Sequence, residues 1–225
     1  MTLLPPGTEY FDVHTHSDKV EDGVLSIFNV FSRNFRDLPQ KRYLSVGFHP
    51  WHLSYENSDN LPEILGKSAV LPRVLAIGET GIDRVISTDI EKQEGIFIEH
   101  LDIASDFNKP VIIHCVRAYS DMIRIKSRYG NNPDWIIHGF NGKLNIAKEL
   151  ISNGMYISLG SGILKDPSKM ANLSDFIPPE RIFLETDEAK TSIKSLYRQL
   201  AEIYGMDIDR LKSIIKENFY KVFIK

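Results

Sequence analysis

Val111-Ile112-Ile113-His114 is a short apolar run that ends in a histidine, and four other segments of the 225-residue chain repeat this arrangement. Each run is followed at once, or within a few residues, by side chains that can bind a metal ion. These residues are His14 and His16 after residues 11–13, Glu79 after residues 74–78, His114, His138 after residues 135–137, and Asp187 after residues 182–184. In a parallel barrel all strands end at one rim, where several strand ends build the active site. The pattern favours a metal-dependent hydrolase.

Eight strands are expected, most of them continuous apolar runs of the kind found in parallel strands covered on both faces. They lie near Tyr10–Val13, Val24–Val30, Tyr43–Phe48, Val74–Gly78, Pro110–His114, Trp135–His138, Tyr156–Leu159 and Ile182–Glu185. Helical patterns lie between or after them, at Asp89–Asp106, Leu144–Asn153 and Asp207–Val222. Eight alternating units predict a closed (β/α)8 TIM barrel of the α/β class, with residues 1–225 as one domain and the metal site at the C-terminal rim of the strands. A doubly wound open sheet is the competing fold, but no Gly-x-Gly-x-x-Gly follows a strand.

Hydropathy and net charge exclude several classes of protein and of substrate. The longest apolar runs fall short of the roughly 18 residues of a membrane span, and the N-terminus lacks the pattern of a secretory signal. A cytoplasmic location follows as the expectation, and no obligate protein partner is visible. A net charge of −3 argues against a broad basic surface for duplex DNA. A phosphate-bearing substrate stays possible, because bound cations supply local positive charge.

The first two elements of the candidate site are a His-x-His pair and a glutamate between glycines. His14 and His16 are two residues apart on an extended segment, so both imidazoles point to one face and can reach one metal ion. Glu79 lies between Gly78 and Gly81 in a segment that permits close approach of the backbone. Its two oxygens could bridge two cations, or the carboxylate could cap a turn.

The other candidate ligands follow later strands. His114 and His138 each come directly after two isoleucines. A core histidine bonded to a carbonyl is the alternative for each, but matching positions in successive strands favour a shared site. Asp187 could bind a metal and orient a water molecule, or serve as a helix N-cap. His100, within the helical pattern 89–106, is interpreted as structural.

Longer motifs carry a family resemblance. They are His14-Thr-His16-Ser-Asp18, Gly47-Phe-His-Pro50, Gly78-Glu-Thr-Gly-Ile-Asp83, Ile113-His114, His138-Gly-Phe-Asn-Gly142 and Leu184-Glu-Thr-Asp187. In this order, and over most of the chain, they resemble the TatD family of metal-dependent deoxyribonucleases. The resemblance implies a TIM-barrel hydrolase that acts on DNA or another phosphodiester, at single strands or ends, with two divalent cations.

The resemblance also implies a division of the ligands between the cations. One cation would be held by His14, His16 and Asp187, the other by His114 and His138, with Glu79 as the bridge and with Glu79 and Asp187 as catalytic residues. Two carboxylates against two divalent cations leave a formal charge of +2, which attracts a phosphodiester. Oxygen and imidazole ligands without a thiolate leave zinc, manganese and magnesium open.

Substrate contacts are predicted at His49, Arg84 and Arg117, with a turn histidine and a surface salt bridge as the alternatives for the first two. Arg117 stands one place later than the family's arginine, which can turn its side chain to the other face. The segment after His16 is short, and Glu188-Ala189-Lys190 replaces the family's loop with proline and tyrosine. Trp51 could stack on a base, or pack at the rim.

Three other functions compete with the nuclease. A phosphatase of the polymerase and histidinol phosphatase type also begins with His-x-His, but it closes with an Asp-x-His pair that Asp187-Glu188-Ala189 lacks. An amidohydrolase cleaving a C–N or ester bond commonly uses a carbamylated lysine where this chain has Glu79. A metal-binding relative without catalytic activity is the third alternative, because the segments after His16 and Asp187 differ from the family pattern.

Overall fold

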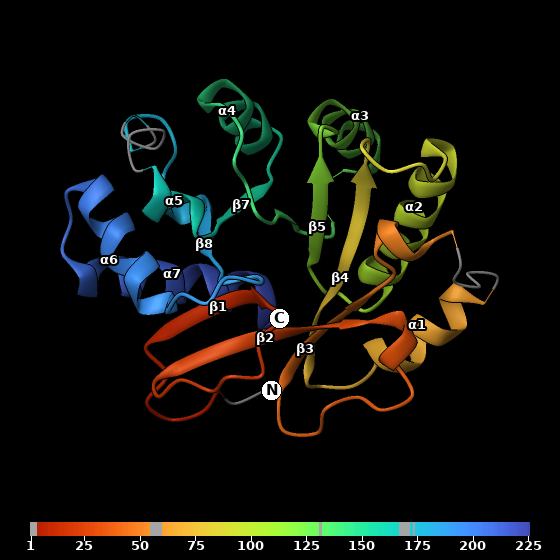
Figure 1. Cartoon of the computed structure of the whole chain (residues 1–225), viewed down its shortest axis with the longest axis horizontal. Coiled ribbons are helices and arrows are strands. Elements are labelled where there is room, and N and C mark those ends of the chain that lie inside the picture. Colours follow the sequence, from red (N-terminus) through yellow and green to blue (C-terminus); the bar gives the residue numbers. More distant parts are fainter. Residues whose placement is uncertain (1–3, 55–59, 131, 167–171, 173) are drawn as a thin grey trace.

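Eight parallel strands form the centre of the molecule in a computed structural model that describes residues 4–54, 60–130, 132–166, 172 and 174–225 (Figure 1). The strands pair in the order of the chain and are β1 (Tyr10–Thr15), β2 (Val24–Phe31), β3 (Tyr43–Gly47), β4 (Val74–Asp83), β5 (Val111–Val116), β6 (Trp135–Ile137), β7 (Tyr156–Leu159) and β8 (Ile182–Leu184). All eight lie within a residue or two of the predicted runs except β4, which is longer.

The last strand returns to the first. Thr15 and Asp187 form a parallel bridge. The backbone N–H of Asp187 donates to the carbonyl of His14 at 2.9 Å, and the N–H of His16 donates to the carbonyl of Asp187 at 3.2 Å. Thr186 adds a buried contact, because its backbone N–H and hydroxyl both donate to the Asp12 carboxylate. The sheet therefore approaches a closed TIM barrel, as predicted, with β1 and β8 joined at the candidate ligands.

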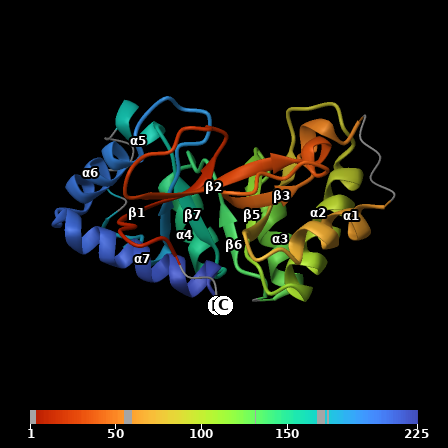
Figure 2. The same ribbon diagram turned by 90° about the horizontal axis from the view of Figure 1, so that it is seen from below.

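Helices cover the outside of the strands (Figures 1 and 2). They are α1 (Leu61–Ala69), α2 (Ile90–Asp106), α3 (Tyr119–Tyr129), α4 (Leu144–Ser152), α5 (Gly162–Lys165), α6 (Ile193–Tyr204) and α7 (Ile208–Phe223), with short 3-10 turns η1 (Ser32–Asn34), η2 (Pro50–His52) and η4 (Pro179–Arg181). Asp89 and Asp207 cap α2 and α7, since each side chain accepts backbone N–H groups of the first turn. The helices predicted at residues 89–106, 144–153 and 207–222 are thus confirmed within a residue.

The expectation of eight complete strand–helix units is wrong for the first two crossovers. Residues 16–23 join β1 to β2 without a helix, and the link from β2 to β3 holds only η1. A crossover that contains a helix needs about 10–12 residues or more, and the first link is shorter. The ends of β1 and β2 are consequently flanked by loops.

Strand β4 runs five residues past the predicted end at Gly78. Its pairing with β5 shifts between Ile77 and Thr80 and then resumes through Asp83. Glu79 therefore lies inside the strand, at the irregularity, with all ten residues of β4 buried. A continuous buried run of this kind fits a parallel strand covered on both faces.

The outer core lies between the strands and the helices, and Phe11 against Phe219 of α7 is one of its contacts, with ring centroids 4.4 Å apart. Trp135 and Phe97 make another, between β6 and α2. None of the helices in the described part of the chain has the length and apolar character needed to cross a bilayer. Packing of this core holds the strand ends, and hence the site, in place.

Candidate metal centre

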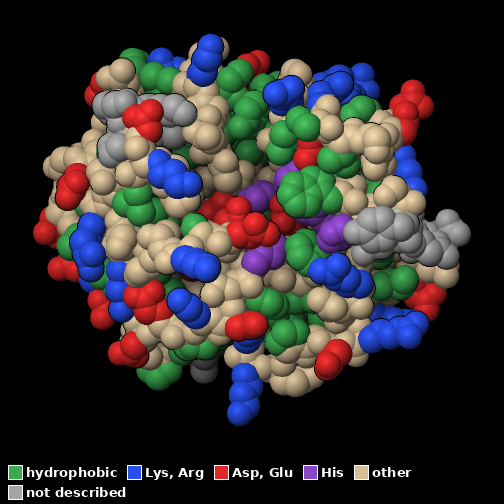
Figure 3. Space-filling view, in the orientation of Figure 1, with side chains coloured by type: hydrophobic (Ala, Val, Ile, Leu, Met, Phe, Trp, Pro, Cys, Tyr) green, Lys and Arg blue, Asp and Glu red, His purple; other side chains and the backbone are tan. Residues whose placement is uncertain are grey.

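Glu79 is the centre of a cluster of histidines and carboxylates, and only 4% of its surface is exposed. Its Oε1 lies 2.7 Å from Nε2 of His138, 2.9 Å from Nδ1 of His114 and 3.1 Å from Nε2 of His49. The three histidines come from the ends of β6, β5 and β3. One oxygen of Glu79 thus contacts imidazoles from the C-terminal parts of three strands. Figure 3 shows histidine and acidic side chains gathered in a hollow of this face.

The second oxygen of Glu79 faces the end of β1. Its Oε2 lies 3.5 Å from Nε2 of His14 and 3.7 Å from Nε2 of His16. Oδ1 of Asp187 lies 3.6 Å and 3.5 Å from the same two nitrogens. The structure therefore brings together all six predicted ligands, with the two Glu79 oxygens facing separate groups of histidines.

The charges of the cluster depend on one another. Burial alone would raise the pKa of the Glu79 carboxyl, but the charge on His138 and hydrogen bonds from the surrounding imidazoles outweigh it and hold that pKa well below its usual value. Burial would likewise lower the pKa of His138, yet the carboxylates of Glu79 and Glu185 raise it well above the usual value. The site is therefore built for Glu79 in its charged form beside positive charge.

Two further carboxylates orient the histidine rings, and the sequence interpretation had not given them this role. Oε1 of Glu185 lies 3.3 Å from Nδ1 of His138, and Oδ2 of Asp83 lies 3.0 Å from Nε2 of His114. With a cation bound, the ring nitrogen that faces Asp83 or Glu185 would keep the proton, which would leave the other nitrogen free to bind the ion. In both rings that other nitrogen faces Oε1 of Glu79.

In His49 the ring nitrogen that faces Glu79 carries the proton. Its Nδ1 accepts the backbone N–H of Trp51 at 3.1 Å, so in the neutral ring Nε2 carries the proton. That N–H donates to Oε1 of Glu79. Although the Glu79, His114 and His49 atoms are close enough to share an ion, a protonated nitrogen cannot bind one. His49 is therefore a hydrogen-bond donor inside the cluster.

The donor set passes a simple test for metal binding. Both ring nitrogens of His14 are buried and have no hydrogen-bond partner within the described ranges. The 3.5–3.7 Å gaps from His14 and His16 to the carboxylate oxygens are too long for hydrogen bonds. Two ligands about 2.1 Å from one ion at a tetrahedral angle lie about 3.4 Å apart. The His14, His16, Glu79 and Asp187 atoms therefore fit a divalent cation between them.

The predicted arginine contacts differ from the histidines. Arg84 makes a forked ion pair with Asp121, at 2.7 Å and 2.8 Å, which is the surface salt bridge considered as its alternative. Its guanidinium is thus engaged with α3, and the contact of Arg84 with a phosphate stays a prediction. Arg117 is exposed and has a left-handed backbone, with φ of 54°. The structure does not bring either arginine into contact with Glu79.

The backbone at Glu79 is held by a polar contact from β2. Oδ1 of Asn29 accepts the N–H of Glu79 at 2.9 Å and the hydroxyl of Ser45 at 3.1 Å, and all three residues are buried. A buried backbone N–H at a register shift lacks its strand partner and needs another acceptor. Asn29 supplies this acceptor, and only its place inside a predicted strand could have indicated it.

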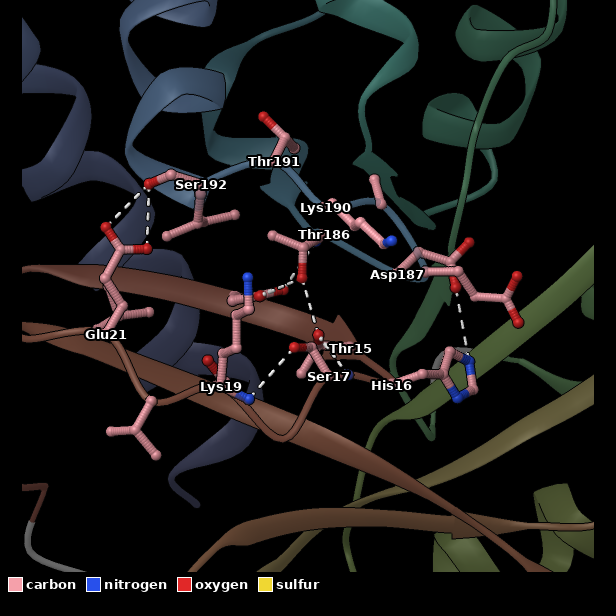
Figure 4. A pocket seen from close by; sticks show the side chains of 17 residues that line it. Thr15, His16, Ser17, Lys19, Glu21, Thr186, Asp187, Lys190, Thr191 and Ser192 are labelled. Atoms are coloured by element: carbon pink, nitrogen blue, oxygen red, sulfur yellow. Dashed lines mark hydrogen bonds and ion pairs between the residues drawn. The ribbon is translucent and has the colours of Figure 1, made fainter.

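A pocket of about 630 Å³ adjoins one side of the cluster (Figure 4). His16 and Asp187 form the end of the pocket nearest Glu79, and its walls come from the loop after β1 and the loop that leads into α6. Lys19 and Lys190 lie on these walls. Much of the pocket is therefore lined by the short segment after His16 and by the loop that contains Glu188-Ala189-Lys190, the two places named above as departures from the family pattern.

His100 positions the turn that carries His49. The carbonyl of Ile96 can only accept, so Nδ1 of His100 carries the proton and donates to it at 2.7 Å, and Nε2 accepts the N–H of Phe48 at 2.9 Å. Burial lowers the pKa of His100 to about 4 and keeps the ring neutral. These contacts confirm the structural interpretation of this histidine.

We expect His100→Leu to destabilise the fold by about 1–3 kcal/mol, because it leaves the N–H of Phe48 buried without its acceptor. His100→Gln should lose less, since an amide can both accept from Phe48 and donate to Ile96. Urea unfolding of the two variants beside the parent chain measures the difference. Equal losses in the two variants would contradict the assigned hydrogen bonds.

Comparison with known proteins places the chain in a family. A family model described as TatD-related DNase matches residues 25–224. A Buchnera aphidicola protein named as an uncharacterized metal-dependent hydrolase is 33% identical over 203 residues, which are 80% of this chain and 76% of that protein. The 3'-5' ssDNA/RNA exonuclease TatD of Escherichia coli K12 is 31% identical over 148 residues, which are 64% of this chain and 56% of the exonuclease.

A solved structure agrees on the fold. The crystal structure of a TatD homologue from Escherichia coli K12 superposes with a TM-score of 0.83 over 97% of this chain and 99% of that one, at 23% identity. The family model spans nearly all of the chain from β2 through α7, and thus four of the six predicted ligand positions, while the His-x-His pair lies before its start at residue 25. The chain therefore belongs to the TatD-related DNase family of metal-dependent hydrolases.

Proposed function

We propose that the chain hydrolyses phosphodiester bonds at the ends of single-stranded DNA or RNA, using two divalent cations. The observation that carries the proposal is the buried Glu79 carboxylate, with one oxygen toward His14 and His16 and the other toward His114 and His138. A bridging carboxylate between two sets of imidazoles is the arrangement expected for a pair of ions. Support for the substrate comes from the relative that acts on ssDNA and RNA.

The six ligands divide as their positions suggest. His14, His16 and Asp187 would hold one cation, His114 and His138 the other, and Glu79 both. When bound, such a pair neutralises charge on the phosphate and lowers the pKa of an attacking water. The ring nitrogens that face Glu79 would be free for a cation, because Asp83 and Glu185 can hold the protons of His114 and His138 on the far side.

Asp187 and His49 would act on the reacting groups. The Asp187 side chain is 41% exposed, so one of its oxygens is open to the solvent side of the cluster. It would orient the water and take its proton as oxygen adds to phosphorus and the bond to the leaving nucleotide oxygen breaks. With Oε1 of Glu79 engaged by a cation, the Nε2–H of His49 would be released from that oxygen to donate to a phosphate oxygen and stabilise the charge that develops there.

The amidohydrolase and the phosphatase alternatives each require a residue that this site lacks in the described part of the chain. A carbamylated lysine would need a lysine near the bridging position, and β4 from Val74 to Asp83 contains none. The residue two places after Asp187 is Ala189 rather than the histidine of the competing phosphatases. Neither observation favours a second function over phosphodiester hydrolysis.

Removal of the metal is the first test of the proposal. We expect purified protein to contain a divalent cation, to lose hydrolysis on chelation, and to regain it with zinc, manganese or magnesium. Elemental analysis is followed by a panel of end-labelled single-stranded DNA, duplex DNA, RNA and a phosphomonoester. Single strands should be shortened from an end. Undiminished turnover after complete stripping, or turnover of the phosphomonoester alone, would overturn the proposal.

A further inference from the structure

Trp51 is exposed although it lies beside the buried cluster around Glu79. Its exposed fraction is 54%, whereas the chain's other tryptophan, Trp135, is fully buried. Trp51 belongs to η2 and lies two residues after His49, which caps this turn. Its ring centroid lies 4.8 Å from that of His49 and 5.8 Å from that of His114. A large apolar surface is thus open to solvent within one side chain's length of the cluster.

Both polar groups of Trp51 are fixed to the site. Its indole N–H donates to Oδ2 of Asp83 at 2.8 Å, and its backbone N–H donates to Nδ1 of His49 at 3.1 Å. The same Oδ2 of Asp83 faces Nε2 of His114. The ring is therefore held in one orientation before any substrate arrives, which lowers the entropy cost of binding against it.

We propose that Trp51 is a stacking platform for the unpaired nucleobase next to the phosphate that is cleaved, an inference that rests on the proposed function. In a nucleic acid a base is separated from its phosphate by a single sugar, a span that fits the short distance from the indole to the histidines. Aromatic side chains stack on any base, so the platform selects nucleic acid without selecting sequence. Bases inside a duplex are already stacked, so the platform favours single strands and frayed ends.

The kinetic test compares two pentanucleotides of equal charge, d(T)5 and the same backbone with all five bases absent. We expect d(T)5 to have a KM about tenfold lower for the parent chain, as stacking predicts. Trp51→Ala should reduce that ratio of KM values toward one, and Trp51→Phe, which keeps a ring but loses the N–H to Asp83, should retain most of it. Phe176→Ala removes an aromatic ring of similar exposure, 52%, and should leave the ratio unchanged.

A binding measurement separates this inference from the proposed function. Phosphorothioate-linked d(T)5 should quench the fluorescence of Trp51, while the base-free phosphorothioate should not, and Trp51→Phe should abolish the quenching. Base-dependent quenching without any turnover would support the platform and refute the nuclease. Turnover with equal KM values for both pentanucleotides, or equal quenching by both, would overturn the platform. A fall in kcat on both substrates in Trp51→Phe, with the KM ratio at one, would assign Trp51 to holding Asp83 instead.

Discussion

Glu79→Gln should abolish hydrolysis of every phosphodiester, with a loss of at least about 10²–10³-fold in kcat. The amide keeps the size of the side chain but removes the negative charge that both groups of histidines face. It also places an NH₂ group among the imidazole nitrogens that face this side chain. The pKa of His138 should fall, because the Glu79 carboxylate is the largest influence that raises it against burial. Metal content, measured by elemental analysis, should drop with activity.

The matched control is Glu63→Gln on α1, where the carboxylate is 65% exposed and pairs with Lys67 four residues later. An exposed pair of this kind contributes little to stability, so the control should retain activity and metal. Circular dichroism of both variants would show whether the barrel persists. A Glu79→Gln protein that is folded, keeps its metal and turns over at the parent rate would remove the central claim about this carboxylate.

The strands and the cluster could be predicted because both follow from local sequence. Short apolar runs with a ligand-type residue at the end mark parallel strands that meet at one rim. This reasoning needs no knowledge of which strands are neighbours, since all C-terminal ends meet there. His14, Glu79 and Asp187, which are far apart in the chain, were for this reason predicted together and are found together.

Other features depend on contacts that no local pattern encodes. The ion pair of Arg84 joins residues 37 positions apart, and the indole contact of Trp51 joins residues 32 apart. The placement of Glu79 inside β4 depends on a register shift against β5, which only the paired strands define. The ring nitrogen that carries the proton in His49 depends on the N–H of Trp51 in the folded turn. Sequence could place these residues near the rim but could not assign their roles.

The glycines around Glu79 show how the backbone and the site depend on each other. Gly78 and Gly81 have φ values of 132° and 146°, in the region that side chains avoid. A Cβ at Gly81 would overlap the carbonyl oxygen of His114, and one at Gly78 would overlap that of Ile112. On the other side, a Cβ at Gly47 would lie 2.7 Å from the Cα of Gly78. Strands β3, β4 and β5 can therefore approach at Glu79 only where side chains are absent.

Gly81→Ala should consequently lower the free energy of unfolding by about 3–5 kcal/mol, from strain at positive φ and from the clash with the His114 backbone. For a chain of this size that corresponds to a fall in Tm of about 10 °C or more. Relief of the clash would displace His114, so metal affinity should fall even at temperatures where the protein stays folded. Thermal unfolding followed by circular dichroism and a metal titration at low temperature measure the two effects.

The same substitution at Gly95 isolates the cause. Gly95 lies in α2, exposed, and a Cβ there would meet no atom within 4 Å. Gly95→Ala should raise stability by up to about 1 kcal/mol, because alanine is the better helix former. A loss of stability in Gly81→Ala and a gain in Gly95→Ala would show that the effect comes from the local backbone and not from the added methyl group itself. If Gly81→Ala unfolded at the parent temperature and bound metal normally, the close approach of β4 to β5 could not be what positions His114 beside Glu79.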